Sequence, residues 1–136
     1  MPLMTWTEKL SVSVKVLDDD HKRLIALIND LHDGLKAGHG KETLGKILDG
    51  LVSYTRFHFE REEQFFAKTG YPNSHAHKKE HDDLTHQVLS VQAKYKGGAD
   101  TTLSMEVMDF LKTWLTNHIQ GSDQKYSAHL NSHGVH

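Results

Sequence analysis

Apolar residues recur at steps of three and four positions in four separate stretches of this chain. The stretches cover residues 18–35, 44–68, 73–95 and 103–118, and each is long enough for several helical turns. Asp18 opens the first stretch with an acidic turn, and glycine or proline residues separate the stretches from one another. The pattern predicts four amphipathic helices.

The sequence shows little sign of a β-sheet beside these helices. Residues 10–16 alternate between apolar and polar positions, but one isolated strand cannot form a sheet. Connections of about three to seven residues are usual between antiparallel neighbours in helix bundles. We therefore predict an all-α fold, an up-down-up-down antiparallel four-helix bundle, in a single domain that covers 1–136. Residues 1–17 are expected to form an N-terminal arm, 18–123 the bundle and 124–136 a C-terminal tail.

The composition stands out in one respect, its twelve histidines. With a rotation of about 100° per residue, His21, His58 and His118 fall on the apolar stripes of the first, second and fourth helices. The third helix carries His77 and His81 on its apolar stripe. Because neighbouring helices run in opposite directions, all five positions fall near the same end of the bundle.

A carboxylate belongs to the same group, because Glu62 lies one turn after His58 on the same helix face. Buried imidazoles and a buried carboxylate are costly to desolvate unless they share a partner, and a metal ion is such a partner. The residues therefore predict a metal centre. They do not select the metal, since imidazole and carboxylate ligands suit iron, copper, zinc and manganese.

Each motif also has an ordinary explanation. Among 136 residues with twelve histidines, about one pair spaced by four positions is expected by chance, and a second such pair, His129 and His133, lies in the predicted tail. A histidine and a glutamate one turn apart are also common on helix surfaces. Convergence from four helices is what favours the metal. The remaining histidines of loops, polar faces and the tail are expected to be solvated: His39, His75, His86, His129, His133 and His136.

The rest of the composition excludes several classes of protein. Without cysteine, the chain can hold neither a thiolate zinc site nor a cysteine-ligated iron–sulfur cluster. Lysine and arginine number 16 against 18 aspartates and glutamates, so no basic field attracts nucleic acid. The apolar runs are too short to cross a bilayer, and the first residues lack the pattern of an export signal. We expect a cytoplasmic protein without nucleic-acid partners or membrane insertion.

The site residues occur in an order that is itself informative. The chain reads His21, His58-Phe-Glu-Arg-Glu62, His77-x-x-x-His81 and His118-Ile-Gln-Gly-Ser-Asp123, with Tyr71-Pro72 before the third helix. This order resembles the hemerythrin family, in particular its single-domain bacterial members, over nearly the whole chain. The resemblance implies a non-haem di-iron centre, with two iron ions joined by a hydroxo or oxo bridge. His77, His81 and His118 would bind one iron and His21 and His58 the other, while Glu62 and Asp123 would bridge the two.

Asp123 sets a geometric condition on this assignment. It follows His118 by five positions, which leaves the two side chains about 140° apart on a regular α-helix. The helix is therefore expected to loosen or end there. Gly121 and Ser122, which lie between them, are compatible with a wider turn or a break.

The resemblance also implies a function, reversible binding of dioxygen at an open position on the iron held by His21 and His58. Oxygen storage, transport or delivery would be its use, with an oxygen-consuming enzyme as recipient and a monomer as the working form. Helix spacing places four apolar residues around the open position as an expected oxygen pocket, although an ordinary bundle core would also need them there. These residues are Leu24, Trp114, Leu115 and Ile119.

Two other functions are compatible with such a centre. A di-iron redox enzyme would act on nitric oxide or peroxide, and a sensor of oxygen or iron would change its surface with occupancy. The paired Glu-x-x-His motifs of ferritin-like oxidases are absent, no acid or base is evident beside the pocket, and the sequence shows no signalling domain. We therefore favour an oxygen-binding protein over an enzyme or a sensor. A purely structural bundle with surface histidines is the remaining alternative.

Overall fold

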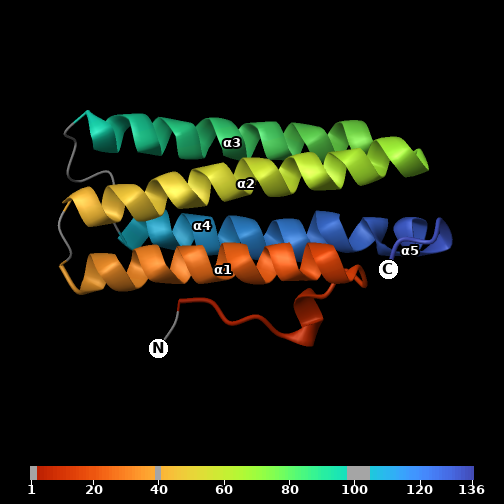
Figure 1. Cartoon of the computed structure of the whole chain (residues 1–136), viewed down its shortest axis with the longest axis horizontal. Helices are drawn as coiled ribbons and strands as arrows, with labels where there is room; N and C mark the ends of the chain where they lie inside the picture. The colour runs from red at the N-terminus through yellow and green to blue at the C-terminus, as the bar shows by residue number, and fades with distance from the viewer. Residues whose placement is uncertain (1–2, 39–40, 98–104) are drawn as a thin grey trace.

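Four long helices lie side by side and antiparallel in the computed structural model, which describes residues 3–38, 41–97 and 105–136 (Figure 1). They are α1 (Lys15–Lys36), α2 (Lys41–Thr69), α3 (Ser74–Lys96) and α4 (Met105–Asn117). The described part of the chain contains no β-strand. The predicted all-α bundle is confirmed. No helix within the described ranges combines the length and the apolar character that crossing a membrane requires.

The apolar stripes of the helices meet in one core. Leu31 of α1, Leu48 of α2, Val88 of α3 and Met108 of α4 are each at most 4% exposed. Such burial stabilises a helix far more than its intrinsic propensity does, because a four-helix core removes one apolar face of every helix from water. The regular spacing of these residues along the chain therefore explains the four helices.

The N-terminal arm differs in part from the expectation. Helix α1 begins at Lys15, so the last three residues of the predicted arm, 15–17, are helical. Before them, a short 3-10 helix, η1 (Glu8–Leu10), and an extended segment lie along the bundle (Figure 1). The Asp18 carboxylate accepts hydrogen bonds from the Ser11 hydroxyl at 2.6 Å and from the Val12 amide at 2.8 Å. The arm is therefore fastened to the first turn of α1.

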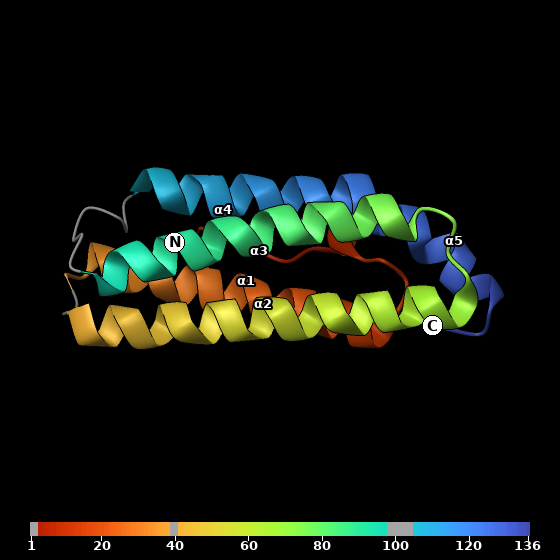
Figure 2. The same cartoon turned by 90° about the horizontal axis from the view of Figure 1, so that it is seen from above.

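The predicted C-terminal tail is also largely helical. Helix α4 continues through a π-helical segment, η3 (His118–Asp123), into α5 (Gln124–Ser132), which turns towards the end of α2 (Figure 2). Tyr126 and Leu130 are fully buried. One buried pair is too short a pattern to reveal a helix from sequence, so this element was missed.

The connection from α2 to α3 places the next elements beside the site. Gly70 adopts a left-handed conformation with φ 67°, and the Tyr71 amide donates to the Phe66 carbonyl at 3.1 Å. This is a Schellman ending, in which glycine avoids the steric strain of a side chain. It turns Tyr71 inward, where its ring packs 4.9 Å from that of Phe66.

Candidate metal centre

All seven predicted ligand side chains converge at one end of the bundle, where α2 ends and where α1, α3 and α5 begin. Each is at most 4% exposed. The antiparallel arrangement brings these positions to one level, as the spacing predicted for the five histidines and Glu62 and the resemblance implied for Asp123. They are His21 on α1, His58 and Glu62 on α2, His77 and His81 on α3, and His118 and Asp123 on η3.

The side chains form two groups that share their carboxylates. Within each group, one nitrogen or oxygen of every residue lies within 4.8 Å of those of the others. Glu62 and Asp123 belong to both groups, so each carboxylate lies between two sets of imidazoles. The first group adds His77, His81 and His118, and the second adds His21 and His58.

The two oxygens of Asp123 face different groups. Its Oδ1 lies 2.8 Å from His77 Nε2 and 3.0 Å from His118 Nε2, whereas its Oδ2 lies 3.0 Å from His21 Nε2. Glu62 is arranged less symmetrically. Its Oε1 lies 3.0 Å from His81 Nε2 and 3.4 Å from His58 Nε2. Both carboxylates are therefore placed to bridge two metal ions.

Short distances do not make these contacts hydrogen bonds. The Nε2 atoms of His21, His77, His81 and His118, Oε1 of Glu62 and both oxygens of Asp123 lack a partner of acceptable hydrogen-bond geometry. So many unsatisfied buried polar atoms in one place would be costly. Two ligand atoms about 2.1 Å from a shared metal and at right angles to it would lie about 3 Å apart, as observed here. The donor set fits a metal.

Three further carboxylates hold the outer nitrogens of the imidazoles. The Nδ1 of His58 lies 3.0 Å from Asp20 Oδ2, and the Nδ1 of His81 lies 3.0 Å from Glu63 Oε2. The third pair joins His118 Nδ1 and Glu80 Oε1 at 3.2 Å. A carboxylate that accepts the Nδ1–H bond leaves the Nε2 lone pair directed at the centre and makes it a better ligand.

The sequence analysis did not single out these three acids, although a signal was present. Asp20, Glu63 and Glu80 are each next in sequence to a predicted ligand, and each contacts a ligand from a different helix. Sequence spacing gives the direction of a side chain around its own helix. It does not give the rotation of the neighbouring helix, which decides whether the two side chains meet.

Asp20 lies in a small network of its own. Burial raises its pKa, but hydrogen bonds with His58 and Tyr54 and the nearby charge of Arg61 together lower it below the usual value. The Tyr54 hydroxyl donates to Asp20 Oδ1 at 2.8 Å, and burial and this carboxylate raise the pKa of Tyr54 to about 12. Asp20 therefore stays ionised behind His58.

The charges inside the cluster oppose one another. Burial raises the pKa values of Glu62 and Asp123, and the charge of Asp123 raises that of Glu62 further, but the surrounding imidazoles lower both below the ordinary range. Burial lowers the pKa of His77, yet Asp123 and Glu62 raise it to about 9. The two carboxylates therefore remain anionic and favour a cation beside them, either a proton or a metal ion.

The π-helical segment meets the geometric condition set by Asp123. A π-helix forms hydrogen bonds five residues apart and has a wider turn, so residues five apart come to the same side. His118 and Asp123, the first and last residues of η3, both reach the cluster. The backbone widens without breaking, and Gly121 does not adopt a left-handed conformation.

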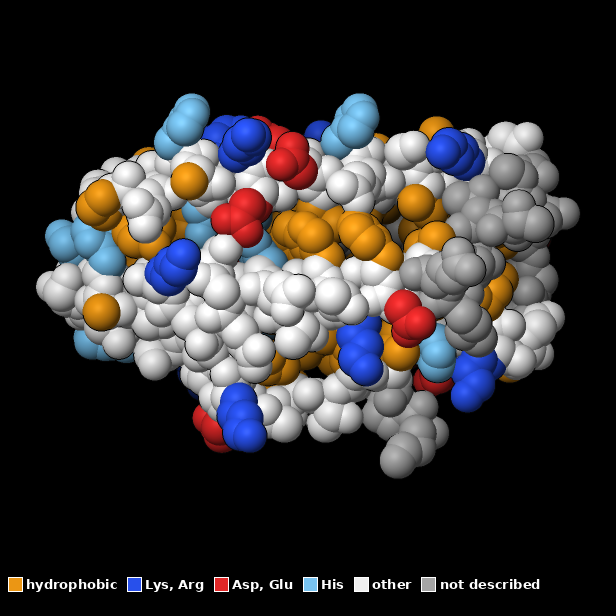
Figure 3. All heavy atoms as spheres, turned by 180° about the vertical axis from the view of Figure 1, so that it is seen from behind, with side chains coloured by type: hydrophobic (Ala, Val, Ile, Leu, Met, Phe, Trp, Pro, Cys, Tyr) orange, Lys and Arg blue, Asp and Glu red, His pale blue; other side chains and the backbone are white. Residues whose placement is uncertain are grey.

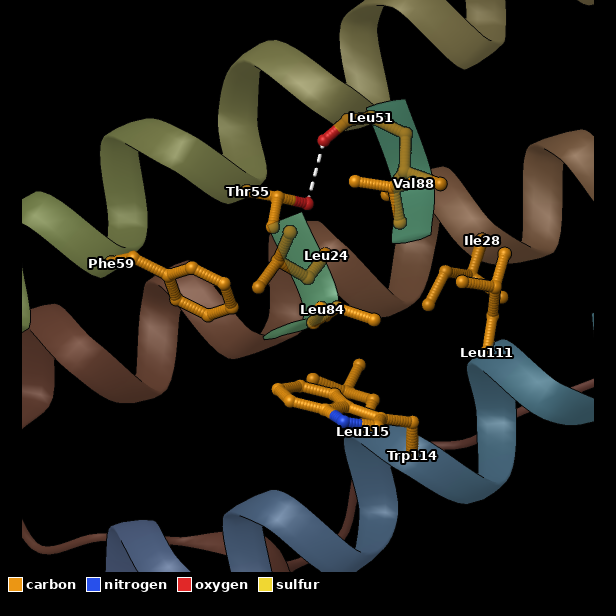
Figure 4. Close-up of a pocket in the computed structure, with 10 residues that line it drawn as sticks. All are labelled: Leu24, Ile28, Leu51, Thr55, Phe59, Leu84, Val88, Leu111, Trp114 and Leu115. Carbon is orange, nitrogen blue, oxygen red and sulfur yellow. Dashed lines mark hydrogen bonds between the residues drawn. The ribbon is translucent and has the colours of Figure 1, made fainter. Parts of the chain in front are cut away.

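An apolar cavity of about 20 Å³ adjoins the centre, with room for the centre of one water-sized molecule (Figure 4). Three of the four residues predicted around the open position, Leu24, Trp114 and Leu115, line this cavity. Ile119 is fully buried but does not line this cavity. The remaining lining residues, which extend along the bundle, are Ile28, Leu51, Thr55, Phe59, Leu84, Val88 and Leu111.

Two aromatic side chains connect the cavity to the ligands. The Phe59 ring stacks on His81 with centroids 3.8 Å apart, and the Trp114 ring stacks on His118 at 4.4 Å. On the face shown in Figure 3, hydrophobic side chains follow the middle of the molecule and histidine side chains show beside them. The apolar interior therefore comes close to the surface on this face.

Comparisons with known proteins agree with this geometry. Residues 12–130 match the family profile described as the hemerythrin HHE cation-binding domain. A bacteriohemerythrin of Methylococcus capsulatus is 37% identical over 133 residues, which cover 97% of this chain and all of that protein. One from Stenotrophomonas maltophilia is 33% identical, over 98% of this chain and 85% of the relative.

A solved structure is similar as well. The crystal structure of a wild-type hemerythrin superposes with a TM-score of 0.87 at 37% identity, covering 94% of this chain and 98% of the other. The fold, the cluster and the sequence likeness thus agree over nearly the whole length. This chain belongs to the hemerythrin family.

Proposed function

We propose that this protein binds dioxygen reversibly at a non-haem di-iron centre, for oxygen storage, transport or delivery. The observation that carries the proposal is a pair of buried histidine groups that share Glu62 and Asp123 beside an apolar cavity. His77, His81 and His118 would hold one iron, and His21 and His58 the other, with a hydroxo or oxo bridge between them. Family membership supports iron over the other metals that suit these ligands.

The centre can bind an external molecule only where one metal has an open coordination position. The first iron would receive three imidazoles, and the second would receive His21 and His58. Both would share the two carboxylates and the bridging oxygen, which leaves the second iron one ligand short. Bound iron would supply a reversible exchange of electrons with dioxygen at that position.

The chain's own residues make the cavity beside the centre dry and poor in protons. Nine of the ten residues that line the cavity have apolar or aromatic side chains, and Thr55 is the exception. The Thr55 hydroxyl donates to the Leu51 carbonyl at 2.7 Å, so its proton is already engaged. A dry, proton-poor wall favours release of dioxygen over its reduction.

The ligands are held so that they need not reorganise. Asp20, Glu63 and Glu80 hold the Nδ1 protons of three imidazoles, and the Tyr126 hydroxyl donates to Glu62 Oε2. A ligand set fixed in this way favours the same geometry before and after a small ligand binds.

The proposal can be tested by measuring iron per chain in anaerobically reduced protein and following its visible spectrum while air is admitted and removed. We expect two irons and a charge-transfer band that appears with dioxygen and disappears on its removal. Glu62→Ala should lose most of the iron, whereas His86→Ala, at an exposed position of α3, should keep it. Zinc in place of iron, or no bound metal, would contradict the di-iron assignment.

A second outcome would change the function but not the centre. Two irons that oxidise at once without a reversible band would favour a redox enzyme for nitric oxide or peroxide, or a sensor. The expectations of a cytoplasmic monomer and of an oxygen-consuming enzyme as recipient accompany the main proposal. Sedimentation of the iron-loaded protein alone tests the monomer, and sedimentation with a candidate oxidase tests the recipient.

A further inference from the structure

Glu80 of α3 makes an unusual set of contacts with the π-helical segment. Its Oε1 lies 3.2 Å from His118 Nδ1, and the Ser122 hydroxyl lies 2.7 Å from Oε1 and 2.9 Å from Oε2. His118 is the first residue of η3 and Ser122 its last but one. One carboxylate therefore joins both ends of the segment to a neighbouring helix.

The other outer carboxylates do not do this. Asp20 contacts the ligand His58, and its remaining partners, Tyr54 and Arg61, both belong to α2 as His58 does. Glu63 contacts His81 and approaches the exposed Lys78, both on α3. Among these three acids of the described chain, only Glu80 contacts the π-helical segment, where it holds both the ligand His118 and Ser122, the residue before Asp123.

The place of this contact makes it mechanically important. Helix α4 packs mainly against α1, and the backbones of α3 and η3 make few close approaches. Side-chain contacts therefore link η3 to α3, and they matter because the ligands His77 and His81 come from α3 whereas His118 and Asp123 come from η3. A π-helical turn is less favourable than an α-helical one, so it needs such outside support.

We propose that Glu80 is a positioning residue that acts through Ser122, holding η3 in its π-helical form and thereby setting the affinity of the centre for metal. The ligand affected is a transition-metal ion bound by His77, His81, His118 and Asp123. The inference rests on the proposed function only in requiring a metal at these residues. Its test therefore uses metal binding and not dioxygen.

Two variants separate this role from a simpler one. Glu80→Gln keeps the shape of the side chain but removes its charge and replaces one acceptor oxygen by an NH2 group, which only donates, so a single oxygen is left to accept from both Ser122 and His118. Ser122→Ala removes the hydroxyl and leaves the Glu80–His118 contact in place. If Glu80 only tuned the imidazole, Ser122→Ala would bind metal like the parent.

The experiment titrates the metal-depleted full-length protein with Co²⁺ and follows its visible spectrum, which reports the number and arrangement of ligands. Loss of an outer hydrogen-bond partner typically weakens metal binding about 10- to 100-fold. We expect a loss in this range for Glu80→Gln and for Ser122→Ala, with an altered cobalt spectrum in both. Ser122→Thr, which keeps a hydroxyl, should restore the affinity and the spectrum of the parent.

Controls keep the result specific. Asp83→Asn makes the same charge change as Glu80→Gln at an exposed position of α3 and should bind Co²⁺ like the parent. The double variant should lose little more than either single one, because both remove one shared contact. Parent-like affinity in Ser122→Ala would overturn the proposal, even if Glu80→Gln were too unstable to measure. The protein could bind cobalt tightly while its iron-loaded form fails to bind dioxygen reversibly. That result would contradict the proposed function and leave this inference standing.

Discussion

Tyr126 shows how one residue outside the ligand set supports the centre. It is fully buried on α5, and its hydroxyl donates to Glu62 Oε2. Burial and the charges of Glu62 and Asp123 raise its pKa well above the ordinary value. The hydroxyl therefore remains a neutral donor, and it links α5 to α2.

Replacing Tyr126 by phenylalanine should test that link. The aromatic packing against Phe66 and His77 would remain, but Glu62 would lose a buried hydrogen bond. We expect the free energy of unfolding of the metal-free protein to fall by about 1.5 to 3 kcal/mol, as measured in urea. Tyr54→Phe removes a hydroxyl that is only partly buried and should cost less. Equal losses in the two variants would argue against a special role for Tyr126.

Leu115 belongs to the cavity wall and to the core at once, with 5% of its surface exposed. Leu115→Ala should lower the free energy of unfolding by about 2 to 5 kcal/mol, the usual cost of a core cavity. If the proposed centre is correct, Leu115→Ala should also let water approach it, so that the air-induced band decays faster into an oxidised form. Leu130→Ala, in α5, makes the same deletion away from the cavity. Equal decay rates in the two variants would mean that the loss of stability, and not the loss of water exclusion, speeds the decay of the band.

At the scale of elements, the π-helical segment carries the clearest prediction. Its glycine, Gly121, has open space where a side chain would begin, and its backbone is not left-handed. Gly121→Ala should therefore keep the bound metal and raise the free energy of unfolding by about 0.4 to 1 kcal/mol. Thermal unfolding with and without metal measures this. A loss of metal would mean that the wide turn does depend on glycine.

The elements differ in how far the sequence could predict them. The four long helices have repeated apolar positions, and the angles of the histidines around them predicted the convergence that the structure displays. The conflict between His118 and Asp123 on a regular helix also predicted that the backbone must loosen. Metal binding by these residues stays a prediction.

Other elements could not be read from local spacing. Helix α5 buries only Tyr126 and Leu130 and depends on the preceding segment to start it, so its apolar pattern is short. The start of α1 at Lys15 depends on Asp18, which holds Ser11 and Val12 of the arm. The acids behind the imidazoles depend on the rotation of neighbouring helices. All three are tertiary effects, which a single helix period does not contain.

At the scale of the whole molecule, the cluster makes stability depend on pH and on metal together. Without metal, the cations that Glu62 and Asp123 can attract are protons. The two carboxylates therefore raise the pKa of His77 to about 9. A raised histidine pKa stabilises the fold fully below the unfolded value of about 6.5, and this contribution is lost as pH rises through about 9. The lowered carboxylate pKa values act oppositely, since their contribution is lost as pH falls.

The metal-free protein should therefore be most stable between about pH 5 and pH 6.5. Between pH 6.5 and pH 9, the loss of the His77 proton alone should lower the free energy of unfolding of the protein by about 3 kcal/mol. The Tm of the protein should fall by about 10 °C over the same range. In the loaded protein the metal takes the place of those protons, so Tm should hold steady over this range and fall only in acid, where protons displace the metal. Thermal unfolding of both forms across this range tests the argument. If Tm changed with pH in the same way in both forms, the buried protons would not be exchanged for metal at this cluster.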